Sequence, residues 1–489
     1  MNMIIGRVKE LKLLNKIYSS HEAEFLVVYG RRRVGKTYLI REFFVCKKCK
    51  LLHATGLQHG SQKKQLKKFA EAISETFLDN ITLEIPKNWD EAFNILHKQL
   101  SKCQEKVVVF LDELPWMATR RSGLLEEIDY YWNRNWSKMP NVILVACGSS
   151  ASWLIRKIID NKGGLHNRVT RSIKLSPFSL AETDEFLKSR SINLTQKYVL
   201  SLYMALGGIP YYLKYIERGL TAEQNIQNIF FTKEAPLQNE FNKLFESLFE
   251  NADAYIELVK LIAQRKEGAR RAELKVDASL SSGGGRLTKR LQDLKEAGFI
   301  EENIPWGRST GEYYKLVDEF CLFYLQWVGS QKQKKFTPDY WLNQSQRPSY
   351  YAWSGYAFEA VCMKHVDHII HALNIKANGQ VSAWRFIPRK KLAEGAQIDL
   401  VIERSDNAIT VCEIKYTDQQ YAIDKQYAKN LKNKVEVFRE KTGTNKQIFL
   451  AMICPNGLKS SAYSEEQIDG GVVTLKDLFI SVIRAVDRS

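Results

Sequence analysis

Two glycines, a lysine and a threonine near the N-terminus have the types and spacing of a phosphate-binding loop. Gly30, Gly35, Lys36 and Thr37 fit the pattern G-x-x-x-x-G-K-[ST]. The glycines let the backbone curl into conformations that a side chain would block. The curled loop directs N–H groups at phosphate oxygens, the lysine reaches the β- and γ-phosphates, and the threonine hydroxyl binds Mg²⁺. The pattern therefore predicts a nucleotide site for ATP and Mg²⁺.

The residues around the motif provide the context that such a loop requires. Residues 25–29, FLVVY, predict a buried strand before it, and residues 38–44, YLIREFF, predict a helix after it. The alternative is a glycine turn that binds nothing. The residues expected to contact the nucleotide are Gly30, Arg31, Arg32, Arg33, Val34, Gly35, Lys36, Thr37 and Tyr38.

A second apolar run, residues 106–113, ends in two acids. It reads KVVVFLDE, and a continuous apolar run is typical of a buried parallel strand. The carboxyl end of such a strand faces the ligand crevice of an open α/β sheet. We therefore expect Asp112 to hold the Mg²⁺ shell and Glu113 to orient and polarise the attacking water. The two motifs together predict ATP hydrolysis.

Two further features could serve the same reaction. Residues 141–150, NVILVACGSS, predict another buried strand, and Ser149 or Ser150 at its end is placed to sense the γ-phosphate. Arg168 is a candidate to stabilise transition-state charge, either within its own chain or from a neighbouring subunit of a homo-oligomer. The alternative for Arg168 is a surface arginine that contacts no phosphate.

The C-terminal part of the chain carries a second group of chemically active residues. Residues 355–373 predict a helix with Glu359, residues 395–403 a strand with Asp399, and residues 408–416 a strand with Glu413 and Lys415. Alternation along a strand points Glu413 and Lys415 to the same face, and Asp399 can join them across a hairpin.

These acids and the lysine are typical of a metal-dependent nuclease. Carboxylates bind Mg²⁺ or Mn²⁺, and the metal polarises a phosphodiester and activates water. Asp399, Glu413 and Glu359 are the expected metal ligands, and Lys415 would stabilise charge on the phosphate. Surface charge is the alternative for any one acid, but charged residues inside an apolar strand are costly.

Two weaker patterns flank the phosphate-binding loop. Cys46 and Cys49, with His53 nearby, form C-x-x-C, but a zinc site needs more ligands, so we favour a helix end leading into a strand over a redox pair. Before the first strand, Gly6, Arg7 and Glu10 resemble a segment that packs on the base of many P-loop ATPases. An ordinary helical cap is the alternative.

The pattern of elements predicts an α/β protein with four domains. Alternating strands and helices over residues 25–175 predict a parallel sheet with helices on both faces. The predicted domains are a P-loop ATPase core at 1–178, a helical lid at 179–250, a winged-helix domain at 251–330 and a nuclease-like α/β domain at 331–489. The winged helix is expected from a helix at 255–263, a Ser/Gly turn at 279–286, a helix at 287–297 and two strands joined by a wing over 298–317.

Several alternatives remain open along these domains. The break at 207–210, GGIP, is a lid over the nucleotide or a turn between helices. Lys289, Arg290 and Lys295 of the winged helix suit phosphate contacts, or that domain only packs between its neighbours. Residues 333–350 are expected to bridge to the last domain. The basic helix at 424–441 is available to DNA or simply solvated.

Composition points to an intracellular protein that binds nucleic acid. The net charge of the 489 residues is +17, which favours nucleic acid, and we expect DNA. The eight cysteines are scattered and several lie in apolar runs, which is typical of reduced, cytoplasmic proteins. The first residues lack the apolar core of a signal peptide, and no stretch reaches the roughly eighteen apolar residues of a membrane span.

Taken together, several motifs resemble those of the archaeal-type ATPase family within the AAA/STAND P-loop group. They are GRRRVGKT, VVVFLDELPW, ILVACGSS, the PFS at 177–179 and GGIPYYL. The resemblance implies a winged helix and a C-terminal domain similar to PD-(D/E)XK nucleases, with Asp399, Glu413 and Lys415 as the D…E-x-K core. It also implies that Pro210, in a G-x-P element, approaches bound nucleotide. Arg168 matches the family's arginine by its place ahead of PFS.

The sequence thus predicts a cytoplasmic ATPase whose nucleotide state controls a C-terminal, metal-dependent DNA nuclease. By fold analogy, such a protein suits defence or mobile-element biology. One alternative is an ATP-dependent switch whose nuclease-like domain binds DNA without cutting it. Another is a protein-remodelling ATPase whose basic charge serves solubility.

Overall fold

A computed structural model describes residues 4–160, 167–276, 284–307, 311–329, 339–376, 380–386 and 395–480. The chain divides into two compact units, Met1–Pro177 and Phe178–Ser489. The first predicted domain boundary, at 178, lies beside this division, while the further subdivision of the second unit stays a prediction. Within the described ranges, no helix is both long and apolar enough to span a membrane.

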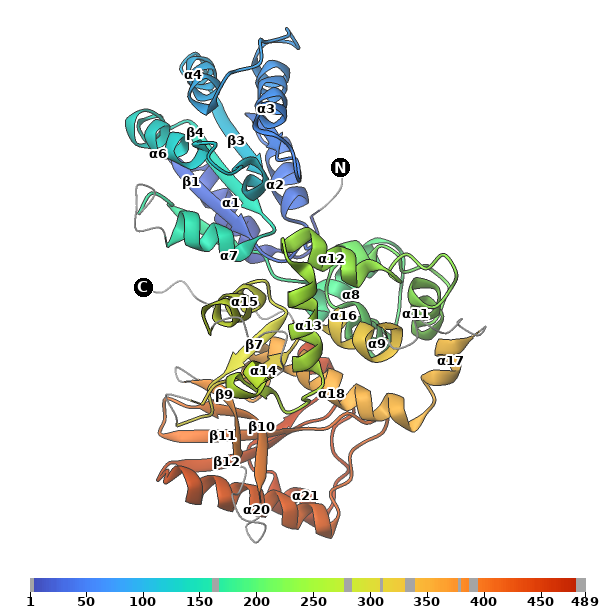
Figure 1. Cartoon of the computed structure of the whole chain (residues 1–489). Helices are drawn as coiled ribbons and strands as arrows, with labels where there is room; N and C mark the ends of the chain where they lie inside the picture. The colour runs from blue at the N-terminus through green and yellow to red at the C-terminus, as the bar shows by residue number, and fades with distance from the viewer. Residues whose placement is uncertain are drawn as a thin grey trace. The chain divides into compact units, whose positions relative to one another are not determined.

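The first unit is built on a five-stranded parallel sheet in the order β2-β3-β4-β1-β5 (Figure 1). The predicted parallel sheet is therefore confirmed. Its strands are β1 (Glu24–Tyr29), β2 (Cys49–Thr55), β3 (Lys106–Asp112), β4 (Val142–Gly148) and β5 (Arg171–Lys174). Its helices are α1 (Val8–Tyr18), α2 (Lys36–Val45), α3 (Gln62–Phe77), α4 (Trp89–Leu100), α5 (Leu114–Met117), α6 (Leu124–Arg134), η1 (Trp136–Lys138), α7 (Ala151–Leu154) and η2 (Ile155–Ile159).

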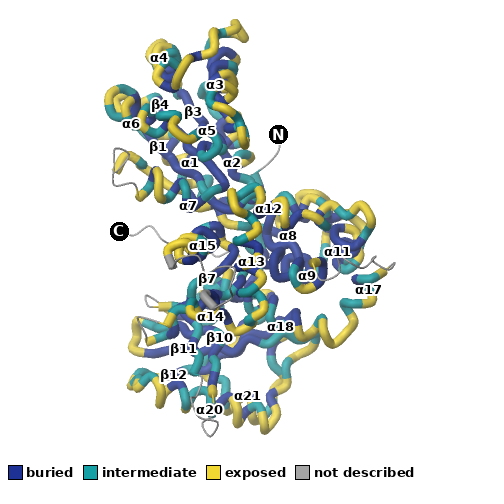
Figure 2. The backbone as a smooth tube through the Cα atoms, viewed as in Figure 1, coloured by how far each residue is buried: buried dark blue, intermediate teal, exposed yellow. Residues whose placement is uncertain are grey.

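The central strands of this sheet are buried on both faces (Figure 2). One face packs under α3, α4 and α6, where Trp89, Phe93 and Trp136 form a cluster of aromatic rings. Because all strands are parallel, the carboxyl ends of β1, β3 and β4 meet at one edge of the sheet. That edge carries the phosphate-binding loop, Asp112 and Ser149.

The second unit begins with a group of helices, where the sequence predicted a helical lid at 179–250. They are α8 (Leu180–Ser189), α9 (Gln196–Leu206), α10 (Pro210–Leu213), α11 (Ala222–Phe230) and α12 (Glu240–Leu248). Three elements from later in the chain, α16 (Glu319–Phe323), η4 (Tyr324–Val328) and α17 (Tyr340–Gln344), join this group, with α16 against α9 and α17 against α11. In the GGIP break, a Cβ on Gly208 would lie 1.9 Å from the Phe178 carbonyl oxygen. The Phe178 N–H also donates to the Gly208 carbonyl at 2.6 Å. Close backbone packing within this unit therefore explains the glycine.

A small antiparallel sheet in the order β6-β8-β7 follows. Its elements are α13 (Ala252–Ala263), β6 (Ala269–Arg270), α14 (Arg271–Val276), α15 (Gly284–Glu296), β7 (Ile300–Asn303) and β8 (Tyr313–Leu316). The two helices and two strands predicted here are present. Most of the expected Ser/Gly turn at 279–286 lies outside the described residues, but its last three residues begin α15. The tip of the expected wing, 308–310, also lies outside the described residues.

The C-terminal part forms a mixed sheet in the order β13-β12-β11-β10-β9. Strands β11, β12 and β13 are parallel, whereas β10 is antiparallel to both β9 and β11. The elements are α18 (Pro348–Lys364), α19 (Val366–Ala372), β9 (Val381–Phe386), β10 (Ala396–Glu403), β11 (Ala408–Ile414), α20 (Lys425–Thr442), β12 (Gln447–Ile453), α21 (Ala462–Gln467), β13 (Gly471–Val473) and α22 (Leu475–Leu478).

Two predictions about the segment that precedes this sheet in the chain need correction. The bridge expected at 333–350 is largely helical where it is described, because α17 and the start of α18 lie within it. Residues 333–338 of that bridge lie outside the described residues. The helix predicted over 355–373 is two helices, α18 and α19, that meet at His365.

Candidate nucleotide site and carboxylate cluster

The phosphate-binding loop depends on glycine at both ends. Gly30 has a φ of 148°, and a Cβ there would lie 2.2 Å from the Leu175 carbonyl oxygen. Gly35 has a φ of 97° and is the N-cap of α2. Arg33, between them, also adopts a positive φ of 73°. The loop thus turns sharply from the end of β1 into the N-terminus of α2, as a phosphate site requires.

Lys36 and Thr37 both point into this site. The buried Lys36 ammonium donates to the carbonyl oxygens of Gly30 and Arg31, at 3.0 Å each. The Thr37 hydroxyl donates to Asp112 Oδ2 at 2.8 Å. The structure therefore brings together residues from β1, α2 and β3 that the sequence assigned to one nucleotide and magnesium site.

Asp112 is nearly fully buried, with 3% of its surface exposed. Burial pushes its pKa up, but hydrogen bonds from His53 and Thr37 outweigh burial and lower the pKa. His53 Nε2 lies 3.5 Å from Asp112 Oδ2. An ionised carboxylate beside a hydroxyl suits the binding of Mg²⁺, so these residues fit the metal that ATP brings.

His53 is a site residue that the sequence pattern did not reveal. The sequence grouped it with Cys46 and Cys49, but α2 ends just before Cys46 and Cys49 begins β2, which confirms the helix-to-strand interpretation. What places His53 in the site is the parallel register that pairs Thr55 with Asp112. No local signal in the sequence encodes that register.

Glu113 is held by the strand beside it. Its Oε2 accepts hydrogen bonds from the Ser149 N–H at 3.0 Å and from the Ser149 hydroxyl at 2.9 Å. Glu113 itself adopts a left-handed conformation, with a φ of 47°, at the N-cap of α5. Of the two serines considered from the sequence, Ser149 is thus the one that contacts Glu113.

Arg7 holds the phosphate-binding loop through backbone hydrogen bonds. Its guanidinium donates to the carbonyl oxygens of Ser176 at 2.7 Å and Val34 at 3.1 Å, and it is almost fully buried. Glu10 lies 3.9 Å from the same guanidinium. Arg7 thereby ties the start of α1 to the phosphate-binding loop, as the resemblance of this segment suggested.

The remaining loop residues and Arg168 differ in their placement. Arg31 is buried, Arg32 lies 5.7 Å from the Trp116 ring centroid, and Tyr38 is exposed. Arg168 is exposed and precedes β5, where Thr170 accepts a hydrogen bond from the N–H of Phe25 at the start of β1.

Arg168 therefore lies at the amino end of β5, whereas the phosphate-binding loop follows the carboxyl end of β1. Because β5 runs parallel to β1, these two positions are at opposite ends of the strands. This position does not support the action of Arg168 within its own chain, which stays a prediction. Its action from a neighbouring subunit also stays a prediction.

In the second unit, Asp399 lies at an irregularity of its strand. The pairing of β10 with β9 shifts register between Ile398 and Val401, which marks a β-bulge at this point. Bulges re-aim side chains and are frequent beside active sites. Asp399 Oδ2 accepts the N–H of Ile414 at 3.0 Å, which fixes the carboxylate beside the end of β11.

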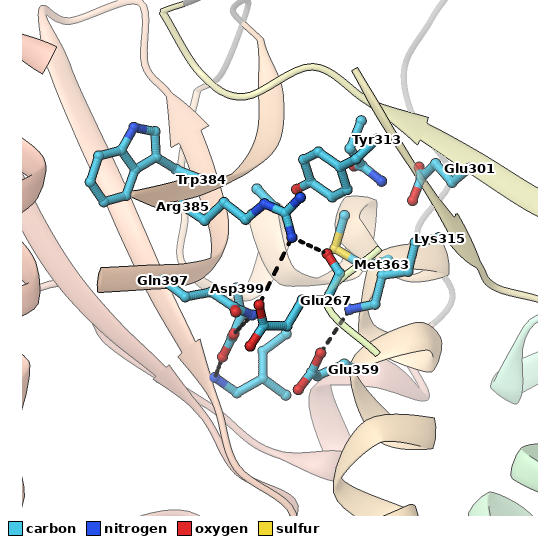
Figure 3. A pocket seen from close by; sticks show the side chains of 13 residues that line it. Glu267, Glu301, Tyr313, Lys315, Glu359, Met363, Trp384, Arg385, Gln397 and Asp399 are labelled. Carbon is cyan, nitrogen blue, oxygen red and sulfur yellow. Dashed lines mark hydrogen bonds and ion pairs between the residues drawn. The ribbon is translucent and has the colours of Figure 1, made fainter. Parts of the chain in front are cut away.

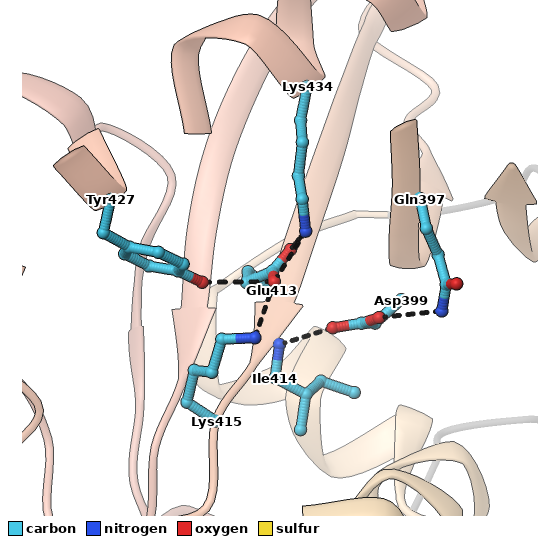
Figure 4. Close-up of polar contacts among 7 residues, drawn as sticks. All are labelled: Gln397, Asp399, Glu413, Ile414, Lys415, Tyr427 and Lys434. Atoms are coloured by element: carbon cyan, nitrogen blue, oxygen red, sulfur yellow. Dashed lines mark hydrogen bonds and ion pairs between the residues drawn. The ribbon is translucent and has the colours of Figure 1, made fainter. Parts of the chain in front are cut away.

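Glu413 is buried within a group of cations (Figure 4). It accepts hydrogen bonds from Lys415 Nζ at 2.9 Å, from Lys434 Nζ at 2.8 Å to each oxygen, and from the Tyr427 hydroxyl at 3.1 Å. Lys434 and Tyr427 both belong to α20, the helix expected to face DNA or solvent. The sequence did not single them out, although their spacing of seven places them on the same helical face.

The pKa values of the two acids are pushed apart. Burial raises the pKa of Asp399 to about 7, and the nearby Glu413 and Glu359 carboxylates add to the effect. Burial also acts on Glu413, but the charges of Lys434 and Lys415 overcome it and lower its pKa. Neighbouring carboxylates with separated pKa values are typical of functional sites.

Glu359 from α18 faces the same site, but its carboxylate is paired with a lysine (Figure 3). Its Oε2 accepts from Lys315 Nζ of β8 at 2.9 Å. Among the residues that the structure describes, no group of three or more histidines, cysteines or acids is assembled to hold a metal. Asp399 and Glu413 supply the oxygen donors that Mg²⁺ or Mn²⁺ prefers, and Glu359 would join them once released from Lys315.

Comparison with known proteins also indicates a nucleotide site in the first part of the chain. A family of ATPase domains found predominantly in Archaea matches residues 4–216. Residues 4–216 form an ATPase domain of this family. The domain is thus a Walker-type ATPase that binds ATP, and the family match covers the phosphate-binding loop, Asp112, Glu113 and Pro210.

Two proteins of Methanocaldococcus jannaschii are similar to this ATPase chain. The uncharacterized protein MJECL04 is 27% identical over 338 residues, which cover 67% of this chain and 69% of that protein. The uncharacterized ATP-binding protein MJ0423 is 44% identical over 48 residues, which cover 10% of this chain and 81% of that protein.

A solved structure shares the fold. The Walker-type ATPase PABY2304 of Pyrococcus abyssi superposes with a TM-score of 0.50 and 20% sequence identity, over 66% of this chain and 96% of that one. The match of the ATPase family ends at residue 216. The function of the C-terminal sheet must therefore be inferred from the residues of that sheet.

Proposed function

We propose that this ATPase controls a metal-dependent DNA nuclease formed by residues 331–489. The observation that carries the proposal is the convergence of Asp399, within β10, with Glu413 and Lys415, at the end of the neighbouring strand β11. Glu413 is buried there and Asp399 and Lys415 are half-buried, and burying charged groups is costly unless they are paired. The bulge that re-aims Asp399 supports the same conclusion.

Each residue of the cluster has a role in phosphodiester cleavage. Asp399 and Glu413 would hold Mg²⁺ or Mn²⁺, with Glu359 completing the ligand set. The bound metal would polarise the phosphodiester and activate water. Lys415, beside Glu413, would stabilise negative charge on the scissile phosphate. The charges of Lys434 and Lys415 keep Glu413 ionised by lowering its pKa.

The rest of the chain supports DNA as the substrate and ATP as the control. The net charge of +17 favours an anionic polymer. Residues 251–330 would supply a winged-helix domain, in which Lys289, Arg290 and Lys295 of α15 suit contacts with the DNA backbone. By the family resemblance, residues 179–250 would act as a lid and Pro210 would approach the nucleotide.

One observation favours a second candidate, a switch that binds DNA without cutting it. Both oxygens of Glu413 are already engaged by Lys434, and Oε1 also accepts from Lys415. A metal must displace at least one of these ammonium groups before it can bind Glu413. If it cannot, the cluster is a structural ion-pair network, and the domain serves binding alone.

Cleavage of supercoiled plasmid distinguishes the two candidates. The wild type is incubated with Mg²⁺ or Mn²⁺, with and without ATP, beside Asp399→Ala and Lys36→Ala. The nuclease requires cleavage by the wild type and its loss in Asp399→Ala, and the Lys36→Ala protein shows whether ATP controls it. Asp406→Ala is the matched control, because Asp406 is an exposed acid paired with Arg404 in the same unit. Intact plasmid under every condition supports the switch.

A further inference from the structure

His53 has a fixed position beside the magnesium-binding acid of the ATPase. Its ring stacks on Phe110, with centroids 4.6 Å apart and planes inclined by 13°. The register of β2 and β3 pairs these same two residues. Its Nε2 lies 3.5 Å from Asp112 Oδ2 and 3.2 Å from the Thr55 hydroxyl. The stacked ring therefore presents one nitrogen to the carboxylate.

We propose that His53 is a positioning residue for Asp112 in ATP hydrolysis. The Thr37 hydroxyl now bonds Asp112 Oδ2, but it is also the expected ligand of Mg²⁺. If that hydroxyl were engaged by the metal, Asp112 would lose its partner in α2. The Nε2–H of His53 would then still hold the carboxylate in place. Such partners behind a metal site fix the geometry of the groups that face the metal.

A matched pair of variants separates the N–H group from the ring. His53→Phe keeps a flat ring over Phe110 and removes the donor, whereas His53→Gln removes the ring and keeps an N–H donor. We expect kcat of His53→Phe to fall about ten-fold, and the Mg²⁺ concentration for half-maximal rate to rise by a similar factor. His53→Gln should retain more activity than His53→Phe.

A binding measurement completes the test without relying on turnover. A fluorescent ATP analogue is titrated with each variant, in EDTA and across a series of Mg²⁺ concentrations. In EDTA the affinities of His53→Phe and the wild type should agree, and only the gain in affinity from Mg²⁺ should shrink. Wild-type Mg²⁺ dependence in His53→Phe would overturn the proposal. Equal losses in His53→Phe and His53→Gln would also overturn it, because the ring packing alone would then matter.

A separate observation concerns the carboxylate cluster, over which the small sheet is packed (Figure 3). Lys315 of β8 pairs with Glu359 at 2.9 Å, and both side chains are largely buried. Arg385 of β9 donates to the Glu267 carbonyl at 2.8 Å and lies 4.4 Å above the Tyr313 ring. These contacts join the small sheet to α18, which carries Glu359, and to β9, which pairs with the Asp399 strand β10.

The space left between these elements is too small for a substrate. Glu359, Asp399, Lys315 and Arg385 line a cavity of about 30 Å³. Such a volume holds about one water-sized group. It therefore has room for a metal ion but not for a nucleotide. In this arrangement Lys315 also competes with any cation for the Glu359 carboxylate.

We infer that the small sheet is an autoinhibitory cover of the cluster, held shut by Lys315 and Arg385. This inference rests on the proposed nuclease function. DNA reaches Asp399 and Glu359 only after β8 separates from α18 and β9. Separation frees Glu359 for the metal, so opening of the cover and completion of the metal site are the same event.

Lys315→Met tests the cover, because methionine keeps an apolar stem and removes the competing charge. We expect metal-dependent plasmid cleavage without ATP to increase several-fold, and cleavage to vanish again when Asp399→Ala is added. Lys446→Met is the matched control, since Lys446 is a partly buried lysine that pairs with Glu403 in the same unit. The control should cleave at the wild-type rate.

Two measurements besides cleavage separate failure of the cover from failure of the nuclease. Mn²⁺ binding, followed by calorimetry, should tighten in Lys315→Met, and the amides of β8 should exchange hydrogen faster. If both changes occur and no protein cuts plasmid, the cover stands and the nuclease fails. If the wild type and Lys315→Met cut equally and β8 exchange is unchanged, the nuclease stands and the cover is overturned.

Discussion

At the scale of single residues, Gly30 shows how closely the phosphate-binding loop fits its surroundings. Gly30→Ala combines a disfavoured φ with a Cβ only 2.2 Å from the Leu175 carbonyl. The backbone strain alone costs about 1–2 kcal/mol, and Leu175 must also move. We therefore expect a lower melting temperature and at least a ten-fold weaker affinity for ATP, roughly 1.4 kcal/mol or more of binding free energy.

Gly123→Ala is the control for this variant. Gly123 has a φ of 72°, but nothing lies within 4 Å of its added Cβ. Gly123→Ala should therefore show the cost of the backbone strain alone, about 1–2 kcal/mol of stability, and its affinity for ATP should be unchanged. Calorimetric unfolding and ATP titration measure both effects. Equal ATP affinities in Gly30→Ala and the wild type would contradict the prediction.

The ion pairs of Glu413 make a second prediction at this scale. Glu413→Gln leaves the Lys434 and Lys415 ammonium groups without their carboxylate. Both lysines are partly exposed, so we expect a loss of about 1–3 kcal/mol rather than the full cost of a buried charge. Urea unfolding measures the loss. Glu440→Gln, in an exposed pair with Lys441, should change stability by less than about 0.5 kcal/mol.

At the scale of elements, His365 connects two helices of the second unit. Its Nε2 accepts the N–H of Leu180 at the start of α8 at 3.0 Å. Its Nδ1–H donates to the Val361 carbonyl of α18 at 2.8 Å. Burial of the ring lowers the pKa of His365 to about 3, while the Val361 carbonyl opposes this shift. The packing of α8 against α18 therefore requires a neutral imidazole.

This requirement predicts a loss of stability in acid. The unfolded chain takes up a proton on His365 near pH 6.5, whereas the folded chain does so only near pH 3, so stability falls as the pH decreases between these values. By pH 5 the loss is about 2 kcal/mol. Urea unfolding at pH 7.5 and at pH 5 measures it. His365→Gln should be less stable at pH 7.5 but lose about 2 kcal/mol less on acidification.

At the scale of the whole molecule, the excess positive charge predicts how the protein binds DNA. If the charge contacts phosphates, the binding constant must fall with salt, because binding releases counterions. Contact with about five phosphates would lower the affinity several-hundred-fold between about 50 and 200 mM salt. Fluorescence anisotropy with a labelled duplex measures this slope. Affinity that does not depend on salt would support the protein-remodelling alternative, in which the charge serves solubility.

The sequence by itself determined the parts whose chemistry is local. The apolar run before Gly30, the glycine spacing and the helix after Lys36 lie within about twenty residues, and local backbone preferences and apolar pattern suffice to predict them. The same holds for β3 ending in Asp112 and for the strands that carry Asp399 and Glu413. The parallel sheet of the first unit followed from the alternation of strands and helices.

Only the tertiary structure decided which distant residues meet. The parallel direction of β5 beside β1 placed Arg168 at the opposite end of the strands from the loop. The register of β2 with β3 brought His53 to Asp112. The packing of α20 turned Lys434 onto Glu413, and the small sheet placed Lys315 on Glu359. Strand order, register and packing depend on the summed burial of many residues far apart in the chain. A local pattern around any one of these four residues therefore cannot contain that information.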